Sequence, residues 1–325
     1  MKIIKPKKLQ KGDTVMIVSP SNSVPKILKS QFDNGIKTLE DMGLTVSIGK
    51  NVLGRYHYSS GTTEERLSDI HEAFADDNIK AVIMSIGGNT ANHLLDGLDF
   101  DLIKENPKIF SGISDGTTLL DPIFSKTGLV TYHGPDLIFG FGLPISPMVK
   151  ENLMKTWFGG KVGQLAPNSN WSGLDELNKN EEYKGWQCIR NGRATGRLVG
   201  GNTTCLTNFD STQFRPNYNN SILFLESFAP SAKELDRVFT HFRQTRIFEE
   251  INGLILGYFF GAAVDKNQSR AVRDVILEVT KEYDFPILEI GEIGHNVENY
   301  IIPIGCQTTI DAEKKYFAID EDTVL

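Results

Sequence analysis

The amino-acid sequence predicts an α/β fold in two parts: a parallel sheet covered by helices, followed by a mixed α/β domain. In the first half, short runs rich in Val and Ile alternate with amphipathic helical stretches, a pattern typical of parallel sheets that are buried on both faces. From about residue 159 to residue 185 the pattern gives way to Gly, Asn and charged residues. A chain of 325 residues is long enough for two ordinary domains.

The first half contains five expected strands, three of which end in polar or glycine turns. An apolar stripe from Leu28 to Leu39 predicts a helix after the first strand, and Thr62 with Glu65 fits a capping box at the start of the next helix. Since the carboxyl ends of parallel strands share one edge, we expect the turns "SPSN", "GGN" and "GISDG" to lie close together. The five strands are expected within residues 14–20, 44–49, 80–86, 108–113 and 128–135.

The second half reads as a mixed α/β domain. Two helices are expected, at Ala232–Arg243 and Ser269–Glu282. We therefore expect a first domain at residues 1–160, a linker or long loop at 161–185, and a second domain at 186–325. Strand candidates in the second half are residues 197–202, 221–226, 253–257, 286–290 and 316–320.

Composition excludes several classes of function. The net charge is −7, and an acidic chain is poorly suited to nucleic acid or an anionic membrane. The sequence contains no apolar run of transmembrane length and no secretory signal, so we expect a cytoplasmic protein. The three cysteines are widely spaced and no HExxH or EF-hand motif occurs, so we expect neither a metal nor another cofactor.

Residues 110–122, "FSGISDGTTLLDP", carry the strongest chemical signal. Residues 112–116 fit G-x-S-x-G, in which a serine occupies a sharp strand-to-helix turn and its hydroxyl is exposed. The next amide, that of Asp115, would lie at a helix N-terminus, where it can help to hold an oxyanion. The alternative is that Ser114 or Asp115 simply caps the helix that follows.

A serine nucleophile needs a base and usually a carboxylate that orients the base. Of the six histidines, His71 and His241 fall within expected amphipathic helices, where surface or packing roles are favoured. His295 follows the strand "PILEI" in a polar loop and is a candidate base. Glu226 closes the apolar run "ILFLE" and is a candidate acid, because a charge at the end of a buried strand is either exposed or paired.

Over nearly its whole length the chain resembles the LD-carboxypeptidase family of serine peptidases, which includes the microcin C immunity peptidases. The resemblance is carried by "KGDTVMIVSPSN", "SGTTEERLSDIHEAF", "IMSIGGN", "NPKIFSGISDGTTL", "KTGLVTYHGP", "GRLVGGN", "ILFLE", "INGLILG" and "GHNVENYIIPIG". It implies a flavodoxin-like N-terminal domain with a parallel sheet, a smaller mixed α/β C-terminal domain, and a homodimer.

The resemblance also implies the roles of individual residues. Ser114 matches the nucleophile, Glu226 the acid and His295 the base of a Ser–Glu–His triad, and the oxyanion donors map to the amides of Gly88 and Asp115. Asn89 stands where relatives often carry an aromatic or acidic residue, and we place it in the substrate pocket together with Trp171. Trp186 is expected in the core.

The resemblance implies hydrolysis of a small peptide-like amide through an acyl-enzyme. The segments "KTGLVTYHGP" and "DLIFGFG" and the loop with Trp171 favour the microcin immunity branch, whose substrates are aminoacyl- or peptidyl-nucleotides. The other branch releases D-Ala from murein tetrapeptides. Two further alternatives stay open: a non-catalytic binding protein of the same fold, and an α/β-hydrolase esterase, which shares the order Ser, acid, His.

Overall fold

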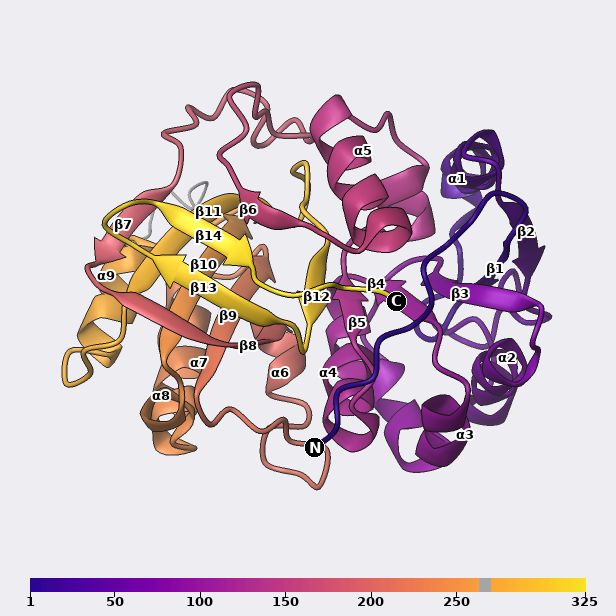
Figure 1. Cartoon of the computed structure of the whole chain (residues 1–325), viewed down its shortest axis with the longest axis horizontal. Helices are drawn as coiled ribbons and strands as arrows, with labels where there is room; N and C mark the ends of the chain where they lie inside the picture. The colour runs from indigo at the N-terminus through magenta and orange to yellow at the C-terminus, as the bar shows by residue number, and fades with distance from the viewer. Residues whose placement is uncertain (263–269) are drawn as a thin grey trace. The chain divides into compact units, whose positions relative to one another are not determined.

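The computed structural model describes residues 1–262 and 270–325, which form two compact units (Figure 1). Unit 1 contains Met1–Lys161, Ile301–Gly305 and Asp322–Leu325, and unit 2 contains Val162–Tyr300 and Cys306–Glu321. The segment expected as a linker, 161–185, therefore falls almost entirely in unit 2. Two short C-terminal segments, expected in the second domain, belong to unit 1.

Unit 1 is built on a six-stranded sheet with the order β12-β5-β4-β3-β1-β2. Strands β1 to β5 pair in parallel in the order 2-1-3-4-5, which is the flavodoxin-like order. Almost every residue of β1 and β3 is buried, which explains their unbroken apolar sequences. The strands are β1 (Thr14–Val18), β2 (Thr45–Ile48), β3 (Ile79–Met84), β4 (Ile109–Gly112), β5 (Thr131–His133) and β12 (Ile302–Ile304).

Helices cover both faces of this sheet. Figure 1 shows α1 and α5 on one face and α2, α3 and α4 on the other. The expected capping box at Thr62 and Glu65 is confirmed at the start of α2. The helices are α1 (Lys29–Asp41), α2 (Thr63–Ala75), α3 (Phe100–Glu105), α4 (Thr117–Thr127) and α5 (Pro147–Leu153), with short helical turns η1 (Lys26–Leu28), η2 (Ala91–Gly97), η3 (Ser114–Gly116), η4 (Leu137–Phe141) and η5 (Met154–Gly159).

Unit 2 is built on an eight-stranded mixed sheet with the order β6-β14-β13-β8-β9-β10-β11-β7. Strands β8 to β11 are parallel, and antiparallel strands flank them on both sides. The strands are β6 (Gly163–Leu165), β7 (Gln187–Arg190), β8 (Arg193–Asn202), β9 (Ser221–Phe228), β10 (Gly253–Phe260), β11 (Ile287–Gly294), β13 (Gln307–Asp311) and β14 (Tyr316–Ile319).

The helices of unit 2 include the amphipathic α7, which buries Leu235, Val238, Phe239 and Phe242 and packs against α9. The predicted start of the last helix, Ser269, lies outside the described residues, and α9 begins at Val272. No helix of the described part of the chain is long and apolar enough to cross a membrane. The helices are α6 (Thr203–Leu206), α7 (Ala232–Gln244), α8 (Ile247–Glu250) and α9 (Val272–Val279).

The fold class is as predicted, but the sequence analysis missed four short strands: β6, β7, β12 and β13. Strand β12 has the sequence Ile-Pro-Ile and lies at the edge of its sheet, antiparallel to β5. Proline has no N–H to donate, so it is tolerated in an edge strand, where one side has no neighbouring strand that needs a donor. A proline within an apolar run also argues against a strand when only the sequence is known, which is why β12 was missed. Strand β6 has only three residues, two of them exposed.

Candidate active site

Ser114 occupies a strained turn between β4 and α4. Its backbone has φ +62°, a left-handed conformation that few residues other than glycine adopt. The strand ends at Gly112, and a short helical turn from Ser114 to Gly116 leads into α4. The turn has the geometry of the nucleophile elbow that the G-x-S-x-G pattern predicts, with Ser114 half-buried at its tip.

Three glycines leave the space that this turn requires. A Cβ atom on Gly112 would lie 2.3 Å from the Met84 sulfur, and one on Gly116 would lie 3.0 Å from the same atom. A Cβ atom on Gly87 would lie 2.8 Å from the Cβ atom of Ser114. The two glycines of the motif therefore accommodate the buried end of β3, and Gly87 accommodates the serine itself.

The three turns expected at one edge of the sheet are joined by hydrogen bonds. The Ser21 hydroxyl donates to Asp115 Oδ2 at 2.5 Å, and the Ala91 amide donates to the same oxygen at 2.9 Å. The Thr90 amide in turn donates to Ser21 Oγ at 3.1 Å. The prediction that "SPSN", "GGN" and "GISDG" meet is confirmed, and the buried carboxylate of Asp115 is their common acceptor.

Arg66 is a member of this network that the sequence analysis missed. Its guanidinium is buried and donates to the carbonyl oxygens of Pro20 at 2.7 Å and Thr90 at 3.1 Å, and also to Thr90 Oγ1. Burial lowers the pKa of Arg66, and the charge of Asp115 opposes that shift. The "EER" of α2 looks like an exposed helical surface in the sequence, so nothing there indicates that one charge points inward.

Gly88 and Asn89 lie after β3, directly before Thr90 of this network. Gly88 has φ +154°, and a Cβ atom there would lie 2.3 Å from Ser21 Oγ and 2.4 Å from Asn22 Oδ1. Only glycine fits such a close approach of two turns. Asn89 is exposed. Ser114, Asp115, Gly88 and Asn89, all expected in the site, thus lie in unit 1.

The two remaining members of the expected triad meet in unit 2. His295 Nδ1 lies 2.6 Å from Glu226 Oε2, and the Asn202 side-chain amide donates to Glu226 Oε1 at 3.1 Å. Glu226 is fully buried, whereas the His295 side chain is 14% exposed. Asn202 was missed as a site residue, although it closes the block "GRLVGGN" and its register partner on β9 is Glu226.

Local backbone features place Glu226 and His295 at the carboxyl ends of β9 and β11. Strand β10 separates β9 from β11, and a Cβ atom on Gly257 of β10 would lie 2.4 Å from Ile293 O and 3.2 Å from Glu226 Cβ. After β11, the Asn299 side chain accepts from the Gly294 amide and donates to the Gly294 carbonyl, which closes the turn that carries His295. The spacing in "GHNVEN" therefore shapes the loop around its histidine.

The contacts of the pair set the chemistry of His295. An ionised carboxylate only accepts hydrogen bonds, so Nδ1 carries the proton that faces Glu226 and Nε2 is the basic nitrogen. The carboxylate also stabilises the imidazolium that forms when Nε2 takes a proton. The ring of Phe228, which is 54% exposed, lies 5.2 Å from the imidazole ring and forms an apolar neighbour of the base.

Trp171 lies in a loop that is fastened to β11. Its indole nitrogen donates to Gly291 O at 2.9 Å, and its ring stacks on Tyr183 with 5.0 Å between centroids. Next to Gly291, the buried Glu292 accepts from the Asn168 amide at 2.6 Å, the Tyr183 hydroxyl and Trp186 Nε1. Burial raises the pKa of Glu292, although these three donors oppose the shift.

Trp186 is fully buried, which confirms its expected place in the core. Within the described ranges, no group of three or more His, Cys, Asp or Glu side chains could hold a metal ion. The candidate chemistry therefore consists of a strained serine among backbone amides in unit 1 and a carboxylate-oriented imidazole in unit 2.

Comparison with known proteins identifies the family of the chain. Residues 15–134 match the model of the LD-carboxypeptidase N-terminal domain, and residues 195–310 match the model of the C-terminal domain. The chain belongs to the LD-carboxypeptidase family. It is therefore a serine-type carboxypeptidase, a hydrolase, as the sequence predicts.

Individual relatives come from both branches of the family. The chain is 32% identical to a probable murein peptide carboxypeptidase of Bacillus subtilis, over 97% of this chain and 94% of that protein. It is 31% identical to the microcin C7 self-immunity protein MccF of Escherichia coli, over 95% of this chain and 94% of that protein. A solved structure of MccF with aspartyl sulfamoyl adenosine has a TM-score of 0.89 at 29% identity and covers 99% of this chain and 100% of its own.

Proposed function

We propose that this carboxypeptidase hydrolyses a small peptide-like amide through Ser114, Glu226 and His295, with an aminoacyl- or peptidyl-nucleotide as substrate. The observation that carries the proposal is the buried Glu226 in contact with His295 Nδ1 at 2.6 Å, because this contact makes Nε2 a base. The strained Ser114 supports it from unit 1, since a hydroxyl presented on such a turn is suited to attack.

The proposed reaction follows acyl-transfer chemistry. His295 Nε2 takes the proton of the Ser114 hydroxyl, and Oγ attacks the amide carbonyl carbon to form a tetrahedral oxyanion. The amides of Gly88 and Asp115 donate to that oxyanion, and each such donor lowers the barrier by roughly 3–4 kcal/mol. His295 then protonates the leaving amine as the C–N bond breaks. Water, activated by the same nitrogen, hydrolyses the acyl-enzyme and restores the serine.

The nucleotide class is supported by the solved MccF structure, whose ligand is aspartyl sulfamoyl adenosine. In the proposal, Trp171 supplies a flat aromatic surface for the base, and Asn89 is an exposed polar contact beside the oxyanion amides. A murein tetrapeptide is the second candidate substrate, and the similarity to the Bacillus subtilis protein favours it. Cytoplasmic location and a homodimer remain predictions.

The two substrates are distinguished by incubating the purified protein with each and measuring the products by mass spectrometry. We expect aspartyl sulfamoyl-adenosine to lose its aspartyl group and the tetrapeptide to stay intact. Release of D-Ala alone would assign the protein to the murein branch. Cleavage of neither would contradict both substrates and favour the binding-protein alternative. Rapid turnover of simple acyl esters would favour an esterase.

The role of Ser114 is tested with the variant Ser114→Ala. Its matched control is Ser125→Ala, the same change on α4 at a half-buried serine that donates only locally, to Pro122 O. We expect the first variant to lose hydrolysis while it keeps its thermal unfolding transition, and the second to keep both. Hydrolysis by Ser114→Ala at the wild-type rate would contradict the proposal.

A further inference from the structure

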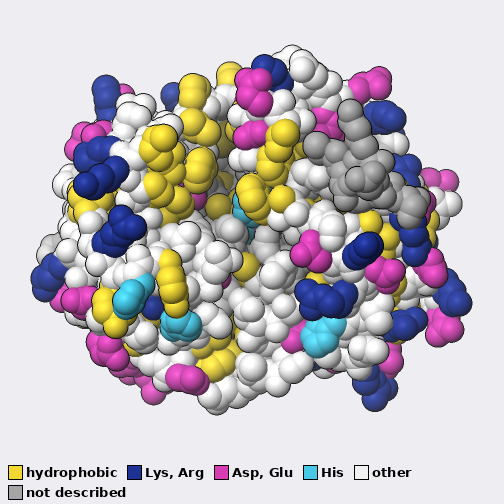
Figure 2. Space-filling view, turned by 180° about the vertical axis from the view of Figure 1, so that it is seen from behind, with side chains coloured by type: hydrophobic (Ala, Val, Ile, Leu, Met, Phe, Trp, Pro, Cys, Tyr) yellow, Lys and Arg dark blue, Asp and Glu magenta, His cyan; other side chains and the backbone are white. Residues whose placement is uncertain are grey.

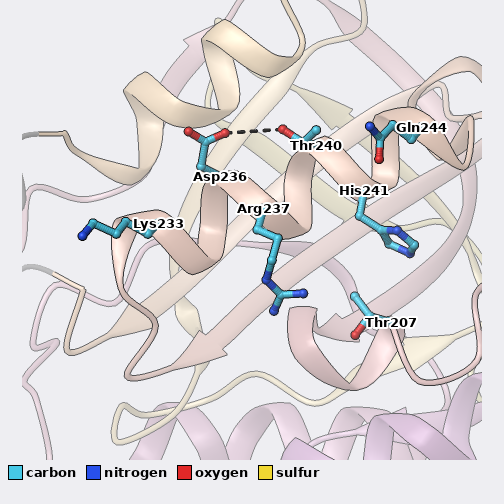
Figure 3. A pocket seen from close by; sticks show the side chains of 7 residues that line it. All are labelled: Thr207, Lys233, Asp236, Arg237, Thr240, His241 and Gln244. Carbon is cyan, nitrogen blue, oxygen red and sulfur yellow. Dashed lines mark hydrogen bonds between the residues drawn. The ribbon is translucent and has the colours of Figure 1, made fainter.

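A hollow of about 650 Å³ lies on unit 2 between α6 and α7, and none of its lining residues belongs to the proposed catalytic site (Figure 3). Its lining includes three basic side chains of α7, Lys233, Arg237 and His241, together with Thr207 at the end of α6. The three basic residues follow one another at intervals of four. Residues four apart lie on the same face of a helix, so the positive groups are grouped along one side.

The acids nearby neutralise this grouping only in part, because Asp236 borders the hollow and the buried Asp210 contacts His241. Among the described residues, none forms a hydrogen bond or ion pair with Arg237. The charge of Arg237 acts on Glu234, but the Glu234 carboxylate is already hydrogen-bonded to Ser231 in the capping box of α7. Like charges four residues apart repel one another, so the arrangement is unfavourable unless an anion is present. The chain as a whole carries a net charge of −7, so this local group of positive charges is opposite in sign to the whole chain.

Asp236 also borders the hollow, but its carboxylate is directed elsewhere. It accepts from the Thr240 hydroxyl and forms an ion pair of 3.8 Å with Arg270. Figure 3 shows the Asp236 carboxylate directed toward Thr240 and away from the guanidinium of Arg237. The carboxylate therefore leaves the side that faces α6 positive.

His241 is held in the hollow by a buried acid. Its Nε2 atom lies 2.8 Å from Asp210 Oδ2, and the Asp210 side chain is only 1% exposed. The carboxylate accepts the Nε2 proton, so the contact with Asp210 fixes the orientation of the His241 ring.

We propose that this hollow binds a phosphate group, as inorganic phosphate or as a small phosphate monoester. A guanidinium matches phosphate oxygens with two parallel hydrogen bonds, and a lysine contributes a mobile second charge. The Thr207 hydroxyl borders the same space, but it already donates to Thr204 O at 2.7 Å and can therefore only accept there. The site is independent of the proposed triad.

Calorimetric titration with inorganic phosphate and with glycerol 3-phosphate tests the site. We expect Arg237→Gln to weaken binding by about tenfold or more, since one charged contact is lost. Arg243→Gln is the matched control, because Arg243 is an exposed arginine of the same helix that does not line the hollow. Tighter binding of the ester than of free phosphate would identify a monoester as the ligand, and equal binding would identify phosphate itself.

No binding of either probe at millimolar concentration would overturn the proposal. Equal weakening by Arg237→Gln and Arg243→Gln would also overturn it. Unchanged unfolding transitions of the variants show that each remains folded.

Discussion

At the scale of single residues, the candidate site depends on glycines, which have no Cβ atom. Ser114 holds φ +62°, a conformation that costs an ordinary residue about 1–2 kcal/mol. The space for it exists because Gly87, Gly112 and Gly116 lack side chains. Neither the strain nor the missing Cβ atoms stabilise the protein by themselves, so their effect is to present the hydroxyl.

Gly87→Ala should therefore impair catalysis more than stability. The new Cβ atom would lie 2.8 Å from Ser114 Cβ and 3.1 Å from Oγ, which forces the hydroxyl to move. A misplacement of about 1 Å can cost roughly 100-fold in rate. We expect kcat to fall by about that factor. Gly159→Ala is the control, since its Cβ atom would meet only Met154 O at an ordinary 3.4 Å. Full activity of the Gly87 variant would contradict the assignment of Ser114.

Glu226→Gln tests the acid at the same scale. Glutamine keeps the shape of the side chain but removes the charge that supports an imidazolium on His295. We expect kcat to fall by about 10²-fold to 10⁴-fold, with little change in KM. Asn202→Ala removes the neutral contact of 3.1 Å with Glu226 Oε1 together with the cap that Asn202 Oδ1 provides at the start of α6, and we expect a smaller loss of kcat. Steady-state kinetics measure both, and equal losses would show that the charge is not the decisive property.

At the scale of elements, turns and loops are fastened by buried charged groups. Arg66 of α2 joins the turns after β1 and β3, and Asp115 joins them to the start of α4. In unit 2, Glu292 of β11 fastens the loop that carries Trp171. Neither Arg66 nor Glu292 could be recognised from the sequence, because a charged residue in a helix or strand is expected to be exposed until its partners are known.

Arg66→Met should destabilise unit 1 and its serine turn together. The change leaves the carbonyl oxygens of Pro20 and Thr90 without their buried donor, at a cost of about 1–3 kcal/mol for each unsatisfied group. Arg66→Lys keeps the charge and should recover part of the loss. Urea unfolding measures the free energy. Wild-type stability of Arg66→Met would show that the network does not hold the turns.

Glu292 should make stability depend on pH. Because burial raises its pKa in the folded protein, the group favours folding below its unfolded pKa, near 4.3, and this contribution is lost as the pH rises through the folded value. The difference in unfolding free energy between wild type and Glu292→Gln should thus shift in favour of wild type as the pH falls from about 7 towards about 4.5. A difference independent of pH would contradict this account.

At the scale of the whole molecule, hydrophobic periodicity predicted the parallel sheet of unit 1 and the mixed sheet of unit 2, since long apolar strands leave a clear pattern. It could not place short edge strands such as β12, which returns to unit 1 from late in the chain. The motifs led to the proposal of Ser114, Glu226 and His295, but they did not indicate Asn202 or Arg66, whose partners are distant in sequence. Figure 2 shows acidic and basic side chains interspersed over one face.

The central claim is that Ser114 forms a covalent acyl intermediate. The most direct measurement is mass spectrometry of the intact and digested protein after rapid mixing with aspartyl sulfamoyl-adenosine and acid quench. We expect a transient aspartyl adduct on the peptide that contains Ser114, and no adduct in Ser114→Ala. An adduct on another residue, or cleavage of the substrate by Ser114→Ala, would contradict the account.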